Sequence, residues 1–265
     1  MKRRRKYVVN STVLLGLMSF LSYNACYAGR SVLSAIMPEM TQNSSFTNEV
    51  LGVWGSMFFL TYGLGQIING IIGDRIKAKY MVFIGLFLSG FVIIASAWAT
   101  SPSIGALCWG LCGFLLSMLW GPLSKLIAEN TTQTTGRILM TSLSAASILG
   151  NMVAYLVASL ASAKHEWKWA LYITGILMIV TAAAWFVILH ALEKKNKLHT
   201  IHRQSESFQT NKQLFHSLKQ NAIIPMLAVA IINGIIRNAV AFWIPTYIAE
   251  KLHTPPATAS AITSI

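Results

Sequence analysis

The chain is poor in charged residues, and poorest in acidic ones. Charged side chains make up 11% of its 265 residues, whereas a soluble domain carries about 25%. Hydrophobic residues make up 54%, which is more than the core of a soluble domain of this size would bury. The shortage of charge argues against an ordinary soluble domain and favours an all-α integral membrane protein.

The residues from which catalytic and metal sites are built are also scarce. The three cysteines, Cys26, Cys108 and Cys112, all lie inside apolar runs. Two thiols on one helix face without histidine or carboxylate make a poor metal site, so we interpret them as packing residues. The sequence has no Ser-His-Asp grouping, metal-ligand spacing or Walker loop. We therefore expect no enzymatic activity, no cofactor and no bound metal.

Long apolar runs account for most of the chain. A spanning helix needs about 20 mostly apolar residues, and seven runs meet this length. They cover roughly residues 8–37, 49–73, 80–100, 102–128, 138–162, 168–191 and 220–248. An eighth run begins near Ala257. The basic start resembles a signal peptide, but the run behind it is too long, so we predict that it is the first spanning helix.

The positive charge is distributed unevenly between the two sides of the predicted membrane. The formal net charge is +13, and lysines and arginines cluster in residues 2–6, 74–79 and 193–219. If the helices alternate in direction, these clusters share one side, and the opposite loops carry few basic residues. This is the positive-inside pattern, and it predicts a cytoplasmic N-terminus. The partner of the basic edge is then the lipid bilayer and not nucleic acid.

Composition changes sharply near residue 192. We predict a six-helix N-terminal bundle over residues 1–191, a polar and basic cytoplasmic linker over 192–219, and the start of a C-terminal bundle over 220–265. The two bundles share a short motif. "RSVLSAIMP" and "RNAVAFWIP" each place a proline after an arginine and seven further residues. Internal repeats of this kind are typical of transporters with two parallel halves.

The two arginines of this repeat, Arg30 and Arg237, lie inside apolar runs. All eight acidic residues fall in predicted loops or at helix ends, so the membrane interior contains no carboxylate to neutralise the arginines. A charged residue at the bilayer centre costs about 3 kcal/mol on insertion scales and usually faces a cavity or a partner. Guanidinium matches phosphate and carboxylate oxygens, so we predict an anion site. The alternative is that each arginine extends to the membrane surface.

Nearby polar residues extend this predicted site. Tyr23 and Tyr27 share a helix face with Arg30, so their hydroxyl groups are candidates to bond substrate oxygens or to pack against the other half. Asn233 lies one turn before Arg237 on the same face. Proton-coupled transporters generally carry acidic or histidine relays inside the membrane. The sequence shows none there, which favours anion exchange over proton symport.

Two further segments predict packing and conformational roles. "GQIINGIIGDRIKAKY" joins the second and third runs, and we assign a conformational role to four of its residues: Gly70, Asp74, Arg75 and Lys79. Glycine there permits close approach of helices. In the fifth run, Ala146 and Gly150 have the spacing of small residues at tight helix contacts.

These segments resemble a known family. The loop from Gly70 to Lys79 resembles the signature loop of the major facilitator superfamily. "YNACYAGRSVLSAIMP" and "RNAVAFWIPTYI" resemble the first and seventh helices of the organophosphate:phosphate antiporters, which include glycerol-3-phosphate and hexose-phosphate transporters. "YGLGQIINGIIGDR" and "LWGP" also fit, so the resemblance spans nearly the whole chain.

The resemblance implies a fold and a mechanism. The fold would be the major facilitator fold, with a six-helix N-terminal bundle followed by the first helix and the start of the next from an incomplete C-terminal bundle. Transport would proceed by alternating access, with Arg30 and Arg237 holding the phosphoryl group and Tyr23 and Tyr27 supporting it. Inorganic phosphate would be exchanged for an organic phosphate or another organic anion.

The chain departs from the family at several positions. It has Gln66 where the family often has lysine, Ser147 where it often has histidine, and Phe242 in place of an acid. Lys77 replaces a usual glycine of the signature loop. These departures weaken the prediction of the organic substrate more than that of an anion. Two alternatives remain: a transporter of a non-phosphate organic anion, and a transporter-like sensor of a phosphorylated ligand.

Overall fold

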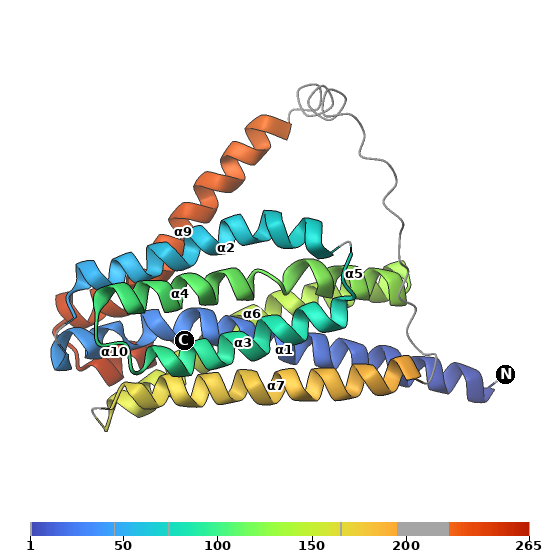
Figure 1. Ribbon diagram of the computed structural model, residues 1–265, viewed down its shortest axis with the longest axis horizontal. Coiled ribbons are helices and arrows are strands. Elements are labelled where there is room, and N and C mark those ends of the chain that lie inside the picture. The colour runs from blue at the N-terminus through green and yellow to red at the C-terminus, as the bar shows by residue number, and fades with distance from the viewer. Residues whose placement is uncertain (1, 45, 74, 165, 195–222, 265) are drawn as a thin grey trace.

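A computed structural model describes residues 2–44, 46–73, 75–164, 166–194 and 223–264 (Figure 1). The described residues form helices joined by short connections and contain no strand. The helices are α1 (Lys2–Asn43), α2 (Asn48–Gly73), α3 (Ala78–Ser96), α4 (Pro102–Leu116), α5 (Trp120–Asn130), α6 (Gln133–Ser162), α7 (Lys168–Lys194), α9 (Ile223–Lys251) and α10 (Pro256–Thr263). The all-α prediction is confirmed. Most of the expected linker, and Asp74, lie outside the described residues.

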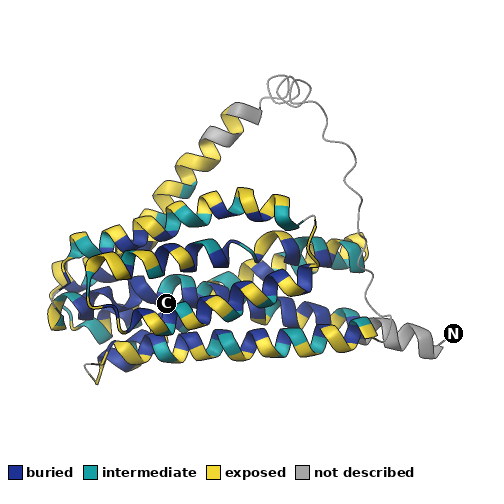
Figure 2. Cartoon of the chain, in the orientation of Figure 1, coloured by how far each residue is buried: buried dark blue, intermediate teal, exposed yellow. Residues whose placement is uncertain are grey.

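Six helical segments are long and apolar enough to cross a membrane. They cover residues 48–73, 78–96, 102–130, 133–162, 168–194 and 229–251. Large apolar side chains on their outer faces are exposed, as the mixed colouring of each helix in Figure 2 shows. Leu107, Leu160 and Val187 are examples, with 65–71% of their surface accessible. This surface suits lipid, so the chain is an integral, multi-pass membrane protein.

Helix α1 is not among these six segments, although the sequence predicts a spanning helix there. Its middle part carries Asn24, Arg30 and several hydroxyl side chains, which lower its hydropathy. In the structure α1 is the central helix and contacts each of the other described helices. Its polar residues can therefore face protein and cavity rather than lipid.

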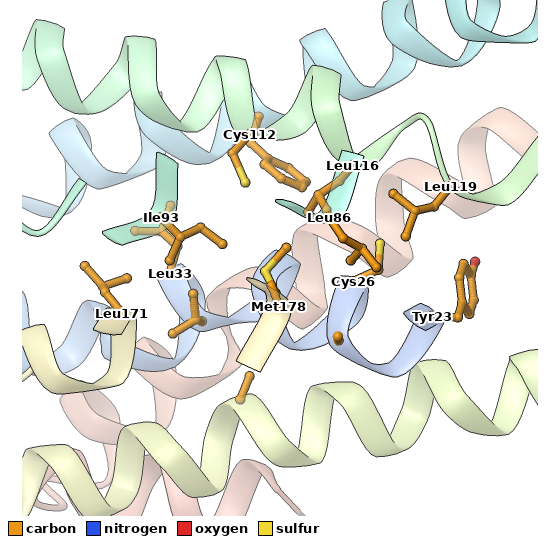
Figure 3. Close-up of a cluster of buried hydrophobic side chains, with 14 of the residues drawn as sticks. Tyr23, Cys26, Leu33, Leu86, Ile93, Cys112, Leu116, Leu119, Leu171 and Met178 are labelled. Carbon is orange, nitrogen blue, oxygen red and sulfur yellow. The ribbon is translucent and has the colours of Figure 1, made fainter. Parts of the chain in front are cut away.

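Buried apolar side chains pack α1 against α3, α4 and α7 (Figure 3). Leu33 of α1 packs in one cluster with Ile93 of α3, Cys112 of α4 and Met178 of α7. Each of these side chains is at most 1% exposed. Cys112 thus has the packing role that the sequence predicts.

Small residues set how closely α6 approaches α1. A Cβ atom built on Gly150 would lie 2.4 Å from the carbonyl oxygen of Asn24, and Asn24 also donates a hydrogen bond to the carbonyl of Ala146. The tight packing predicted at Ala146 and Gly150 is confirmed. At Gly70 the expectation of close approach is wrong, because no described atom lies within 4 Å of a Cβ built there.

The fourth apolar run is interrupted, whereas the sequence predicts one continuous helix over 102–128. The chain leaves α4 at Leu116 and starts α5 at Trp120. Pro122 has no N–H to bond the carbonyl of Met118, and the backbone between the two helices makes tighter turns that bond residues three apart. Trp120, the first residue after the interruption, places its ring 5.4 Å from that of Tyr23 on α1.

The two ends of the bundle differ in how α9 meets it. We call them the Asn43 end, which contains Asn43 and Lys251, and the Lys2 end, which contains Lys2 and Lys194. At the Asn43 end α9 packs against α1 and α10 (Figure 1). Toward Ile223 it diverges from α2. Side chains of α9 between Ile231 and Trp243 line a cavity together with side chains of α1 and α2.

Helix α4 approaches α2 at Gly113, which predicts a packing defect for a larger residue. A Cβ atom there would lie 2.3 Å from the carbonyl oxygen of Phe58. We expect Gly113→Ala to lower the melting temperature in detergent by several degrees, because the two helices must separate. Gly121→Ala is the matched control, since nothing lies within 4 Å of its Cβ position. Equal melting temperatures for the two variants would contradict the close contact.

Candidate substrate-binding site

A cavity of about 870 Å³ lies between α1, α2 and α9. Its lining includes both arginines of the repeat, together with aromatic, glycine and amide residues. The residues are Tyr27, Arg30, Glu49, Gly52, Val53, Gly55, Ser56, Phe59, Tyr62, Gly63, Gln66, Trp120, Ile231, Gly234, Ile235, Arg237, Asn238, Ala239, Phe242 and Trp243. Its volume is within the usual range for small-molecule sites.

A second cavity of about 180 Å³ adjoins the first on the side of α6. The two share Arg30 and Arg237 as lining residues. The smaller cavity adds hydroxyl and amide groups from α1 and α6, namely Ser31, Ser34, Ser147, Asn151 and Tyr155. Both arginines therefore face a polar recess on one side and a larger, more aromatic space on the other.

Arg30 is held by aromatic rings and by an amide. Its guanidinium carbon lies 5.4 Å from the ring centre of Tyr27, 5.3 Å from Phe59 and 5.0 Å from Tyr62. At these distances the ring faces attract a cation. Its Nη2 also donates a hydrogen bond of 2.7 Å to Oδ1 of Asn238 on α9. The rings stabilise the charge without using the N–H donors, so donors remain for an anion.

Neither arginine has a carboxylate partner in the described part of the chain. The ion pair found there joins Lys79 to Glu193, away from the cavities. Glu49 lines the larger cavity, but its carboxylate accepts a hydrogen bond from Thr47. Arg237 is exposed to both cavities. Two guanidinium groups that face one space without a described carboxylate partner have the donors that an anion with several oxygens needs.

The three other predicted site residues, Tyr23, Tyr27 and Asn233, differ in their position relative to the cavities. Tyr27 lines both cavities. Tyr23 is buried behind the lining, with its ring 5.0 Å from that of Tyr27 and 5.4 Å from that of Trp120. Asn233 is exposed and lines neither described cavity. The amide of α9 that contacts Arg30 belongs to Asn238 instead.

Several lining residues were not among the predicted site residues. Phe59, Tyr62 and Gln66 on α2 all face the larger cavity. Their spacing of three and four residues places them on one helix face, and this pattern is visible in the sequence. Asn238 follows Arg237 directly, so only the rotation of α9 in the fold decides that it faces Arg30.

Three of the four positions at which the chain departs from the family line the cavities, and Lys77 does not. Gln66 and Phe242 line the larger one, and Ser147 and Phe242 the smaller one. Each is a neutral residue where the family often carries a charged or titratable one. The described part of the cavity wall thus has its positive charge concentrated on the two arginines.

The described residues of the predicted conformational loop differ in their surroundings. Gly70 is exposed on α2, Arg75 is exposed in the following turn, and Asp74 lies outside the described residues. Lys79 is 4% exposed and forms an ion pair with Glu193 near the end of α7. Its backbone carbonyl accepts a hydrogen bond of 3.1 Å from the indole of Trp185. Lys79 therefore ties α3 to α7 within the bundle.

Among the described residues, no three histidine, cysteine or acidic side chains lie close enough together to hold a metal ion.

Glu39, near the C-terminal end of α1, is buried. Its carboxylate accepts hydrogen bonds from the hydroxyl of Ser162 and from the backbone N–H of Trp167. It joins α1 to the connection between α6 and α7, outside the cavities.

Comparison with known families agrees with this arrangement. The profile of the Major Facilitator Superfamily matches residues 19–265. The chain belongs to this superfamily. The resemblance inferred from the loop and the arginine helices is thereby confirmed at the level of the superfamily.

Similar proteins of known name include carriers of phosphate esters. The "Probable hexose phosphate transport protein" of Chlamydia trachomatis is 23% identical over 87% of this chain and 56% of its own length. The "Glycerol-3-phosphate transporter" of Haemophilus influenzae is 26% identical over 88% of this chain and 55% of its own length. The "Membrane sensor protein UhpC" of Escherichia coli is 26% identical over 61% of this chain and 37% of its own length. The chain spans about half the length of the first two.

Solved structures support the fold alone. A bacterial homologue of the human lysosomal transporter Spinster, in an inward-facing and unoccupied conformation, matches with a TM-score of 0.77 and 13% identity. The match covers 95% of this chain and 58% of that one. The nucleoside transporter NupG, as a D323A mutant, matches with a TM-score of 0.73 and 16% identity over 96% of this chain and 64% of its own. The named relatives are transport and sensor proteins of membranes, not enzymes.

Proposed function

We propose that the protein is a secondary transporter that works by alternating access and exchanges an organic phosphate for inorganic phosphate. The carrying observation is that Arg30 and Arg237, from different helices, line the same two cavities and have no carboxylate partner in the described residues. Phosphate offers several oxygens to two such donors at once. The names of the phosphate-ester transporters among its relatives support this choice of anion.

The proposed mechanism follows from the charges in the cavity. A bound dianion neutralises both arginines, whereas an empty site leaves two positive charges in a low-dielectric region. Reorientation is therefore easier with an anion bound, and this favours exchange over net movement. The described residues of the lining contain no histidine, and their carboxylate, Glu49, lies near the Asn43 end, so a proton relay through the site has no support.

The direct test is counterflow in vesicles. Proteoliposomes containing the full-length protein would be loaded with labelled inorganic phosphate and diluted into buffer. We expect fast efflux when glucose 6-phosphate, glycerol 3-phosphate or unlabelled phosphate is added outside, and slow efflux in buffer alone. No phosphate efflux under any of these conditions, together with exchange in parallel vesicles loaded with a labelled sugar acid or dicarboxylate, would overturn the proposal in favour of another anion.

A sensor is the second candidate, and the similarity to the membrane sensor protein favours it. A sensor would bind a phosphorylated ligand without moving it across the membrane. The two functions separate when binding is measured on the same vesicles. Saturable phosphate binding without counterflow would favour the sensor.

A further inference from the structure

Both prolines of the repeat lie inside helices, Pro38 in α1 and Pro245 in α9. A proline has no N–H, so it leaves the carbonyl four residues earlier without its usual helical partner. In α9 this carbonyl belongs to Ala241, and that of Phe242 follows on the same turn. Buried in a membrane protein, such a carbonyl needs a partner from elsewhere.

Side chains of the six-helix bundle supply these partners. The hydroxyl of Tyr155, on α6, donates a hydrogen bond of 3.2 Å to the carbonyl of Ala241. The hydroxyl of Ser34, on α1, lies 2.6 Å from the carbonyl oxygen of Phe242 and 3.4 Å from that of Ala241. Ser34 is 2% and Tyr155 is 7% exposed, so water does not replace these bonds in this conformation.

A related contact occurs at the other proline. Pro38 removes the helical N–H partner of the Ser34 carbonyl, and the carbonyl of Ala35 follows on the same turn. Ser260 of α10 donates a hydrogen bond of 2.8 Å to the carbonyl of Ala35, and this bond is fully buried. Each proline-containing helix thus accepts, near its proline, hydrogen bonds from a segment far away in the chain.

Aromatic rings complete the contact beside these bonds. The ring of Phe242 occupies the space above Gly55, where a Cβ atom would lie 2.3 Å from it. The ring of Trp243 lies against Gly52 in the same way, at 3.2 Å. The contact therefore depends on glycines of α2 as well as on the two hydroxyl groups.

We propose that Ser34 and Tyr155 are positioning residues that hold the Pro245 turn of α9, and that this contact closes the Asn43 end of the site. Arg237 and Asn238 lie one turn before Ala241, so fixing this turn sets the rotation of α9 that brings Asn238 to Arg30. When this end opens, the carbonyl of Ala241 faces the cavity, where water can bond it. The backbone carbonyl at this turn then has a hydrogen-bond partner in both conformations, so the contact can form and break reversibly.

The test is disulfide cross-linking between cysteines introduced at Asn48 and Glu250, whose side chains are hydrogen-bonded at the Asn43 end. Each single-cysteine variant controls for links to the native cysteines. We expect Tyr155→Phe and Ser34→Ala each to slow cross-linking by about threefold or more, because the closed conformation is less populated. Tyr172→Phe, on α7 and away from the contact, is the matched control and should have no effect.

Pro245→Ala gives the decisive comparison, because alanine restores an N–H for the carbonyl of Ala241. In this background Tyr155→Phe should no longer change the cross-linking rate. Unchanged cross-linking in Tyr155→Phe, or an equal effect of Tyr155→Phe with and without Pro245, would overturn the proposal. Size-exclusion profiles establish that each variant is folded. The assay needs no substrate, so its outcome is independent of the anion that the protein carries.

Discussion

Arg30→Lys and Arg237→Lys are each expected to reduce phosphate counterflow by about 10- to 100-fold, the equivalent of a lost charge-assisted hydrogen bond of about 1.5–3 kcal/mol. Lysine keeps the positive charge but has no planar fork of donors. At Arg30 it also fits less well among the three rings that surround the guanidinium. The measurement is the initial rate of labelled phosphate efflux at equal protein density.

Three other variants sharpen this prediction. Arg137→Lys, on the exposed surface of α6, is the matched control and should exchange at the wild-type rate. Asn238→Asp places a carboxylate where an amide oxygen now lies 2.7 Å from Arg30. This internal anion should compete with substrate and abolish exchange, whereas Asn238→Ala should not. Wild-type rates in both arginine variants would show that the arginines do not bind the transported anion.

Lys79→Met is expected to destabilise the bundle by about 3 kcal/mol, because it leaves Glu193 without its partner in a largely buried place. The side chains of Lys79 and Glu193 are 5% and 21% exposed, so the loss should fall at the lower end of the range for buried pairs. The loss of stability should appear as a lower melting temperature. It should also appear as faster proteolysis of the bundle, because the contact between α3 and α7 is weakened.

The double variant Lys79→Met/Glu193→Leu separates the pair from simple packing. If the cost comes from the unpaired carboxylate, removing it should recover most of the lost stability. Lys77→Met, two residues earlier and exposed, controls for loss of a positive charge. A double variant that is less stable than Lys79→Met would contradict this explanation.

The sequence predicts the helices well, because they follow from strong local signals, whereas the chemistry of the site stays a prediction. Apolar runs define where helices span, and an unpaired arginine in such a run has few stable environments. The prediction that Arg30, Arg237 and Tyr27 belong to one site agrees with their common lining of the cavities. It remains to be tested by ligand binding.

Other features depend on how the helices rotate against one another, which local signals do not determine. Asn233 lies four residues before Arg237, on the same face of an ideal helix, and Asn238 lies directly after it, yet the packing of α9 turns Asn238 toward Arg30. The ion pair of Lys79 joins residues 114 positions apart. The interruption before Trp120 depends on a single proline within a run whose hydropathy is otherwise continuous.

The three rings around Arg30 have a consequence for the entropy of binding. A free arginine side chain samples many rotamers, and ordering it on ligand binding costs about 0.5–1.5 kcal/mol. Here Tyr27, Phe59 and Tyr62 restrict the guanidinium through contacts within the protein itself. That ordering cost is met during folding and is not repeated in each cycle. A carrier that must release one anion and capture another many times would thus keep its binding group preorganised throughout.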